Sequence, residues 1–162
     1  MAEIVVADAG PLIAFGRLHQ IDLLGRVFER VVVPRAVFEE TQRRPDLPDA
    51  RAIVDAARSG VLFVDDSAPG SARLPGADLG EGEAAAILLA AERGHGVLID
   101  DKQGRAVAAA LNLRVIGTVG VLLIARQGGL IPAIKPVLEH LMASGYHLSE
   151  DLAHAALRQA GE

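Results

Sequence analysis

The sequence predicts an α/β protein with an open, parallel β-sheet that is covered by helices on both faces. Short runs of branched apolar residues alternate with helical stretches along the chain. Strands that are apolar on both faces are typical of parallel sheets, because crossover helices bury both sides of such a sheet. The chain has 162 residues, of which 51% are hydrophobic, so it can bury the core that this fold requires.

The strands are recognised by runs of Val, Ile and Leu, each followed by an Asp, a Gly or a Pro. In chain order, the predicted strands cover residues 3–7, 30–33, 61–64, 97–99 and 113–116. The first strand ends at Asp8, and the fourth ends at Asp100 and Asp101. These acids therefore mark the carboxyl ends of two strands.

Helices are predicted between the strands from helix-forming composition and from the Pro and Gly residues that open or end them. They cover residues 12–27, 34–41, 50–58, 79–92 and 103–111, and three more follow residue 119, with breaks near residues 128–129 and 144–145. Residues 65–78 are rich in Ser, Pro and Gly and are predicted to form a mobile surface loop rather than a domain linker. We therefore interpret residues 1–162 as one domain.

Composition excludes several classes of function. The chain has no cysteine, which rules out a disulfide scaffold, a thiolate nucleophile and a zinc finger, so a bound metal would have oxygen or imidazole ligands. The net charge of −5 means that any affinity for nucleic acid must be local. The apolar runs are shorter than the roughly 20 residues of a membrane span, so we expect a cytoplasmic protein with no membrane segment.

Carboxylates gather where a ligand would bind. Open parallel sheets bind ligands at the carboxyl ends of their strands, where Asp8, Asp100 and Asp101 lie, while Glu40 and Glu83 lie on helices that follow a strand end and the loop. If the first and fourth strands are neighbours, these acids converge, and like charges repel unless they are protonated or bridged by a cation. Oxygen ligands alone suit Mg²⁺ or Mn²⁺. The alternative is structural, because Asp often caps a helix and Glu is favoured in its first turn.

Four segments occur in a characteristic order. They are VVADAGPLI at residues 5–13, VPRAVFEE at residues 33–40, LGEGEAA at residues 79–85, and LIDD at residues 98–101 followed by Gly104 and Arg105. The ordered set resembles the PIN-domain family of the VapC-like ribonuclease superfamily, in a prokaryotic branch. The similarity continues through VIGTVG at residues 115–120 and GGLI at residues 128–131 to the end of the chain. It implies a three-layer α/β/α PIN-like domain with a parallel five-stranded sheet of order 3-2-1-4-5.

The resemblance also implies an Mg²⁺- or Mn²⁺-dependent endoribonuclease that hydrolyses RNA phosphodiester bonds, like the toxin of a toxin–antitoxin pair. The implied partners are RNA and an antitoxin protein, and we expect a homodimer. Carried over by position, the catalytic candidates are Asp8, Glu40, Glu83 and Asp101, and the metal-binding candidates are Asp8, Glu83, Asp100 and Asp101. Because successive residues at a strand end point to opposite sides, one of Asp100 and Asp101 should face the cleft, and Asp101 is preferred.

Two alternatives to a ribonuclease follow from the residues after the first Asp. PIN ribonucleases often carry Ser, Thr or Asn there, whereas Ala9, Gly10 and Pro11 offer no hydroxyl or amide side chain. This difference favours a non-catalytic PIN-like module that binds RNA or protein. A phosphatase of similar topology would use a strand-end Asp as nucleophile, but Asp8-Ala9-Gly10 lacks the Asp-x-Asp sequence expected of haloacid-dehalogenase-type phosphatases.

Three arginines are candidates for RNA binding. Arg105 lies on the helix after the fourth strand, where it could contact a phosphate or pair with an acid of the cleft. Arg43 and Arg44 lie in a loop, where they could touch RNA or remain solvated. We predict that these residues supply the local positive charge that an acidic chain needs to bind RNA.

Overall fold

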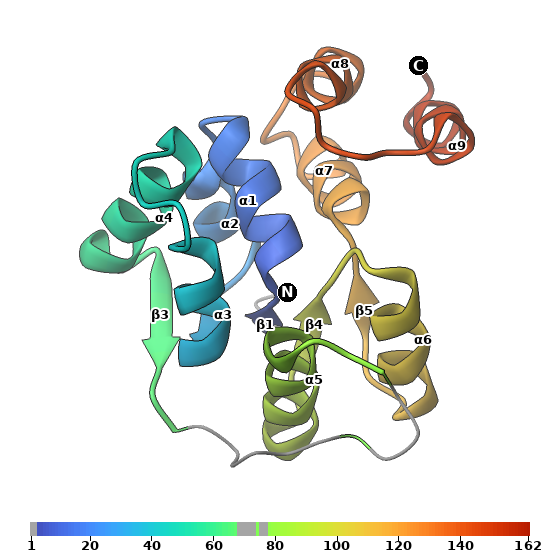
Figure 1. Cartoon of the computed structure of the whole chain (residues 1–162). Coiled ribbons are helices and arrows are strands. Elements are labelled where there is room, and N and C mark those ends of the chain that lie inside the picture. The colour runs from blue at the N-terminus through green and yellow to red at the C-terminus, as the bar shows by residue number, and fades with distance from the viewer. Residues whose placement is uncertain (1–2, 68–73, 75–77) are drawn as a thin grey trace.

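A parallel sheet forms the centre of the protein, as the computed structural model of residues 3–67, 74 and 78–162 shows (Figure 1). Its strands are β1 (Ile4–Ala7), β2 (Arg30–Pro34), β3 (Leu62–Asp65), β4 (Gly96–Leu98) and β5 (Val115–Ile116). They lie in the order β3-β2-β1-β4-β5, and every pair of neighbours is parallel. The predicted α/β class and the strand order 3-2-1-4-5 are therefore confirmed.

Helices cover the sheet in two layers. On one side, four helices pack among themselves: α1 (Ala9–Arg17), α2 (Ile21–Val27), α4 (Pro48–Ser59) and α7 (Thr118–Gln127). On the other side, α5 (Glu81–Arg93) packs against α6 (Lys102–Ala110). The connections between parallel strands are right-handed. The chain moves along the sheet in one direction from β1 to β3 and in the opposite direction from β3 to β5. The helices of these two halves therefore lie on opposite faces of the sheet. The short helix α3 (Arg35–Thr41) contacts both α1 and α5.

One predicted helix proves to be two. The periodicity predicted a single helix over residues 12–27, but α1 ends at Arg17 and α2 begins at Ile21. Between them His19 has a φ of 54°, a left-handed conformation that His adopts more readily than most residues. No Gly or Pro marks this turn, so the sequence carries no ordinary signal for the break. The strands differ less from their predicted ranges: β3 and β4 are each displaced by one residue from the predicted strand, and β5 is shorter than predicted.

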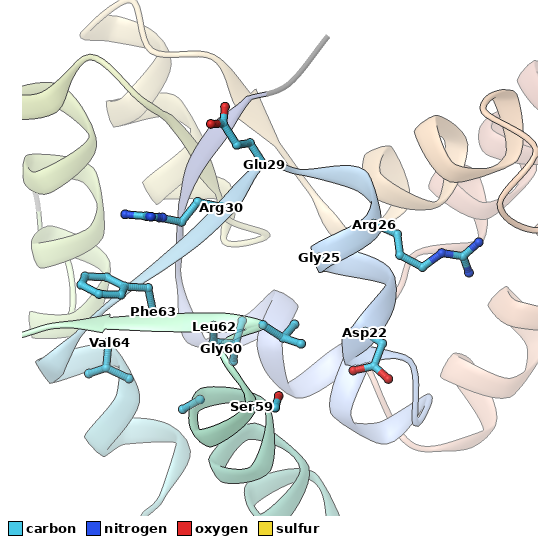
Figure 2. Close-up of a pocket in the computed structure, with 12 residues that line it drawn as sticks. Asp22, Gly25, Arg26, Glu29, Arg30, Ser59, Gly60, Leu62, Phe63 and Val64 are labelled. Carbon is cyan, nitrogen blue, oxygen red and sulfur yellow. The ribbon is translucent and has the colours of Figure 1, made fainter.

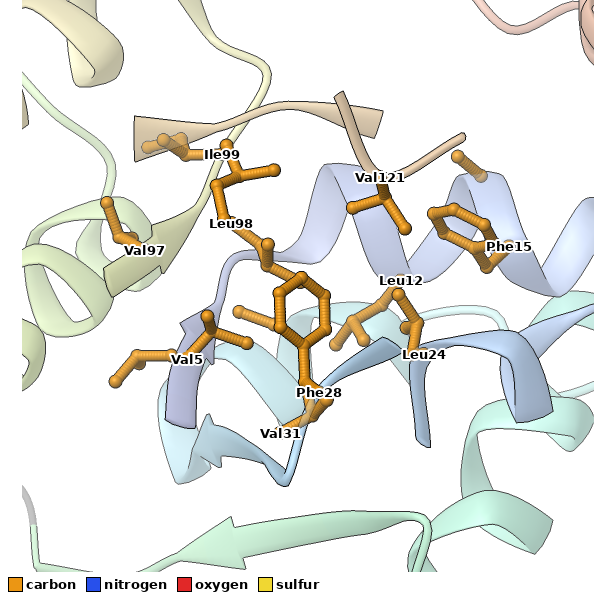
Figure 3. Close-up of a cluster of buried hydrophobic side chains, with 14 of the residues drawn as sticks. Val5, Leu12, Phe15, Leu24, Phe28, Val31, Val97, Leu98, Ile99 and Val121 are labelled. Atoms are coloured by element: carbon orange, nitrogen blue, oxygen red, sulfur yellow. The ribbon is translucent and has the colours of Figure 1, made fainter. Parts of the chain in front are cut away.

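One part of the core lies between the sheet and the layer that contains α1, α2 and α7 (Figure 3). Ile87 and Leu89 of α5 are also buried and extend the core on the other face of the sheet. Val5 of β1, Leu98 at the end of β4, and Leu12 and Phe15 of α1 have no exposed surface. In β1, Val5, Val6 and Ala7 are all fully buried, as expected for a central strand with helices on both faces. The strand that ends at Asp8 is therefore held rigidly by packing on every side.

Phe15→Ala should test this core directly. Removing a fully buried phenyl ring leaves a cavity, and we expect a loss of about 3–5 kcal/mol in the free energy of unfolding, measured by urea denaturation. Phe63→Ala is the matched control, because half of Phe63 is exposed and its loss should cost less than about 1 kcal/mol. Equal losses in the two variants would contradict the assigned core.

The last helices pack on the body of the protein. Leu138 and Leu141 of α8 (Lys135–Ala143) are buried, and α9 (Glu150–Ala160) packs against α7. Gly129 and Gly145 adopt positive φ angles of 74° and 88°, which explains the breaks predicted near them. Within the described ranges, no helix is long and apolar enough to cross a membrane. Most of the loop predicted over residues 65–78, namely residues 68–73 and 75–77, lies outside the described residues.

Candidate functional site

Asp8 lies at the carboxyl end of the central strand and is held there by its backbone. Its amide donates a hydrogen bond to the carbonyl of Leu98 at 2.9 Å, which places Asp8 beside the end of β4. The residue precedes α1, but its side chain does not cap that helix. Only 6% of Asp8 is exposed, and its Oδ1 atom is buried without a hydrogen-bond partner among the described residues. A buried carboxylate oxygen that lacks a partner is costly unless a proton or a cation satisfies it.

The electrostatic surroundings of Asp8 are negative. Burial first, and then the charges of Glu83, Glu40 and Asp100, together raise the pKa of Asp8 from its ordinary value of 3.8 to about 7, against a hydrogen bond from the Ala9 backbone that lowers it. Three of the other predicted site acids therefore lie close enough to act on Asp8. The structure thus brings together Asp8 and Asp100 from the ends of two strands with Glu40 and Glu83 from two helices. We call these four acids the acidic cluster.

Asp100 is the most firmly held of these acids. It follows β4, and its Oδ1 accepts a hydrogen bond from the Thr118 amide at 2.7 Å, in the first turn of α7. Its Oδ2 accepts hydrogen bonds from the Thr118 hydroxyl, at 2.6 Å, and from the Tyr146 hydroxyl. Burial, and then the charge of Asp100, raises the pKa of Tyr146 above its ordinary value of 10.0, so this hydroxyl stays protonated and donates.

Asp101 has a structural contact of its own. It caps α6, since its Oδ2 accepts a hydrogen bond from the Gly104 amide at 2.8 Å, and it is exposed. Its charge nevertheless reaches the cluster, because it helps to raise the pKa of Glu83. Asp100 thus acts on Asp8 and Asp101 acts on Glu83, so both members of the pair contribute charge to the cluster. The preference for Asp101 as the fourth site acid stays a prediction.

Glu40 and Glu83 come from α3 and α5, which pack against each other. Both are half-buried. Burial raises the pKa of Glu83, and the charges of Asp101 and Glu40 raise it further. Gly82 makes room for this arrangement, because a Cβ atom at residue 82 would lie 2.6 Å from Oε2 of Glu40. The second glycine of Gly80-x-Gly82 therefore accommodates a carboxylate.

Gly82→Ala should affect the site more than the fold. The added methyl group would displace the end of the Glu40 side chain, which is flexible, and Ala favours a helix over Gly. We expect a change of less than about 1 kcal/mol in the free energy of unfolding and a loss of about tenfold in the RNA cleavage that the resemblance implies. The control is Gly25→Ala on α2, an exposed helical glycine near the other end of the sheet. Equal activity in both variants would contradict a role for the position of Glu40.

The three predicted RNA-binding arginines are all exposed. Arg105 lies beside Asp100 across Gly117: a Cβ atom at residue 117 would be 2.4 Å from Nη1 of Arg105 and 2.9 Å from Oδ1 of Asp100. Within the described part of the chain, Arg105 forms no ion pair. Arg43 and Arg44 follow α3, the helix that carries Glu40. Arg105 is therefore near Asp100 in space, whereas Arg43 and Arg44 are near Glu40 in the sequence. Contact of these three arginines with RNA stays a prediction.

Two residues that hold the site were missed from the sequence. Thr118 follows strand β5 by two residues, so the rule that ligands bind at the carboxyl ends of parallel strands could have indicated it. Tyr146 lies in the connection between α8 and α9, 46 residues from its partner Asp100. No local pattern marks Tyr146, because its contact depends on how the last two helices pack.

A groove of about 760 Å³ lies elsewhere on the protein, near the amino ends of β2 and β3 (Figure 2). It is lined by residues of α2, α4 and these strands, including Arg26, Arg30 and Phe63. The Arg30 guanidinium lies 5.4 Å from the centre of the Phe63 ring. None of the predicted site acids lines this groove, so it is separate from the acidic cluster.

The acidic cluster suits a hard cation by its chemistry. Among the residues that the structure describes, no three carboxylate or imidazole side chains converge closely enough to form a complete metal site as they stand. The unpartnered Oδ1 of Asp8, however, is a buried oxygen donor surrounded by further carboxylates. Oxygen donors with net negative charge are the ligands that Mg²⁺ and Mn²⁺ prefer.

Comparisons with known proteins agree with this fold. No curated protein matches the chain in sequence. Among solved structures, the chain is similar to a PilT N-terminus domain protein from the hyperthermophilic archaeon Sulfolobus solfataricus, with a TM-score of 0.51 and 18% identity over 91% of this chain and 98% of that one. A family model described as a PIN domain matches residues 4–162. The predicted resemblance is thereby confirmed, and the chain belongs to the PIN domain family.

Proposed function

We propose that this protein is a metal-dependent endoribonuclease that hydrolyses RNA phosphodiester bonds. PIN domains are typically nucleases, and they usually use divalent metal ions. The observation that carries the proposal is the carboxylate of Asp8, which is buried and unpartnered at Oδ1 and has the charges of Glu83, Glu40 and Asp100 around it. An arrangement of this kind costs stability and is therefore expected where it serves binding or catalysis.

The acids would have two different roles, metal binding and proton transfer. Asp8, Glu83, Asp100 and Asp101 are the proposed metal ligands, and Asp100 and Asp101 keep free acceptor capacity beyond their hydrogen bonds to the protein. Bound Mg²⁺ or Mn²⁺ would activate water and stabilise charge on a phosphoryl oxygen. Glu40 would accept a proton of the attacking water as the oxygen of that water bonds to phosphorus. The bond from phosphorus to the leaving oxygen would break in the same step, and the leaving oxygen would take a proton from solvent.

RNA must approach an acidic site on a chain with a net charge of −5. Arg105, which is exposed beside Asp100, would offset this charge next to the reacting phosphate. Arg43 and Arg44 would contact the RNA backbone farther along the strand, from the end of α3. Because these contacts are electrostatic, RNA binding should weaken as salt is raised.

The test is incubation of the purified protein with a mixed RNA pool in the presence of Mn²⁺, Mg²⁺ or a chelator. We expect cleavage with metal and none with chelator, read as internal cleavage products on a denaturing gel. Cleavage that persists in chelator would contradict the metal dependence. RNA binding without cleavage under every condition would instead support the non-catalytic module that Ala9-Gly10-Pro11 favours.

The proposal extends to partners that have their own tests. A toxin role requires an antitoxin protein, so a small DNA-binding protein encoded next to this gene should bind the chain and inhibit cleavage. The homodimer expected from the sequence should give twice the chain mass of 16.9 kDa in light scattering at micromolar concentration. A monomeric mass would contradict it.

A further inference from the structure

The connection between α8 and α9 brings an aromatic side chain to the acidic cluster. Tyr146 is half-buried, its ring packs against the hydrophobic core, and its amide donates a hydrogen bond to the carbonyl of Leu141 at 3.3 Å. Its hydroxyl donates to Oδ2 of Asp100. The ring is thus anchored by the core, while the hydroxyl reaches an acid that precedes it by 46 residues.

Residue 10 lies next to this hydroxyl. Gly10 follows Asp8 by two residues in the first turn of α1. A Cβ atom at residue 10 would lie 3.4 Å from the Tyr146 hydroxyl oxygen and 3.8 Å from Oδ2 of Asp100. The Tyr146 hydroxyl therefore lies next to the turn that begins at Asp8, within ordinary contact distance of a Cβ atom at residue 10.

The hydrogen bonds of Asp100 leave little freedom to its carboxylate. Each carboxylate oxygen has about two acceptor positions. The hydroxyls of Thr118 and Tyr146 both donate to Oδ2, and the Thr118 amide donates to Oδ1. The remaining acceptor position is therefore on Oδ1, and the rotation of the carboxyl group is fixed by three donors.

We propose that Tyr146 is a positioning residue, which together with Thr118 fixes the orientation of the Asp100 carboxylate so that the open acceptor position on Oδ1 can serve as a ligand oxygen. This inference rests on the proposed function, since it concerns the same site. Tyr146 need not touch RNA or metal, because it acts through Asp100. Groups that orient a ligating carboxylate typically contribute about 10- to 100-fold to metal affinity or activity.

Tyr146→Phe tests this role cleanly, because it keeps the ring in the core and removes only the hydroxyl. We expect the dissociation constant for Mn²⁺, measured by EPR titration, to rise about 10- to 100-fold. At saturating RNA, kcat should fall at a fixed metal concentration while KM for RNA stays within about twofold, as expected when substrate binding is intact. The melting temperature should fall by only about 2–4 °C. Ser144→Ala is the matched control, because its hydroxyl binds the Leu141 carbonyl in the same connection without touching Asp100.

A double-mutant cycle separates positioning from a general structural role. If Tyr146 acts through Asp100, Tyr146→Phe should have no further effect on Mn²⁺ affinity in an Asp100→Asn background. An equal loss in both backgrounds, unchanged Mn²⁺ affinity in the single variant, or loss of folding in Tyr146→Phe would each overturn the inference. If the wild type neither binds Mn²⁺ nor cleaves RNA, the proposed function fails and the positioning role falls with it. If the wild type binds Mn²⁺ and cleaves RNA but Tyr146→Phe gives one of the three contradicting results, only the positioning role is rejected and the proposed function is retained.

Discussion

Asp8→Asn is expected to reduce metal-dependent RNA cleavage to background and, in metal-free buffer above pH 7, to stabilise the fold. The substitution keeps the size of the side chain but removes the charge that would bind the cation. It also removes the charge that burial and three neighbouring carboxylates disfavour. A rise in pKa from 3.8 to about 7 corresponds to a cost of up to about 4 kcal/mol, so we expect a gain on the order of 2 kcal/mol.

Opposite effects on activity and stability would distinguish a functional acid from a structural one. Cleavage of a mixed RNA pool in Mn²⁺ and urea denaturation in chelator at pH 8 measure the two effects on the same preparation. Asp55→Asn is the control, because Asp55 is an exposed acid on α4 and its loss should change neither quantity by much. A variant at Asp8 that is both inactive and strongly destabilised would show that the carboxylate is structural.

Mn²⁺ is expected to stabilise the wild type far more at pH 8 than at pH 5. In the folded protein the pKa of Asp8 is raised to about 7, so between about pH 4 and pH 7 the folded state holds a proton that the unfolded state has lost. This group therefore contributes a stability that falls as pH rises through that range. The raised pKa of Glu83 acts in the same direction. A metal ion must compete with these protons at pH 5 but not at pH 8.

Thermal melts with Mn²⁺ or chelator at both pH values measure this linkage. At a metal concentration about 100-fold above the dissociation constant, the stabilisation at pH 8 should approach about 2.7 kcal/mol. In Asp8→Asn the gain should disappear at both pH values. An equal gain at pH 5 and pH 8 would mean that the metal binds without displacing a proton from this cluster.

Much of the fold could be predicted because its signals are local. Runs of branched apolar residues identified the strands, and the glycines at residues 128–129 and 145 identified helix breaks that the structure confirms. The break at His19 could not be predicted, because a His in the left-handed region has no distinctive neighbours in the sequence. At this residue the packing of α1 and α2 on the same core determines the backbone conformation.

The sequence by itself determined the α/β class and the acids that follow the ends of β1 and β4, because strand periodicity and strand ends are properties of a few consecutive residues. Only the tertiary structure decided how those acids are held. Neighbouring Asp100 and Asp101 look alike in the chain, yet Asp100 is held by Thr118 and Tyr146 whereas Asp101 caps α6. No hydroxyl follows Asp8 in the sequence, but the fold brings the hydroxyl of Tyr146 next to Gly10. These contacts join segments far apart in the chain, so they depend on how the helices pack against the sheet.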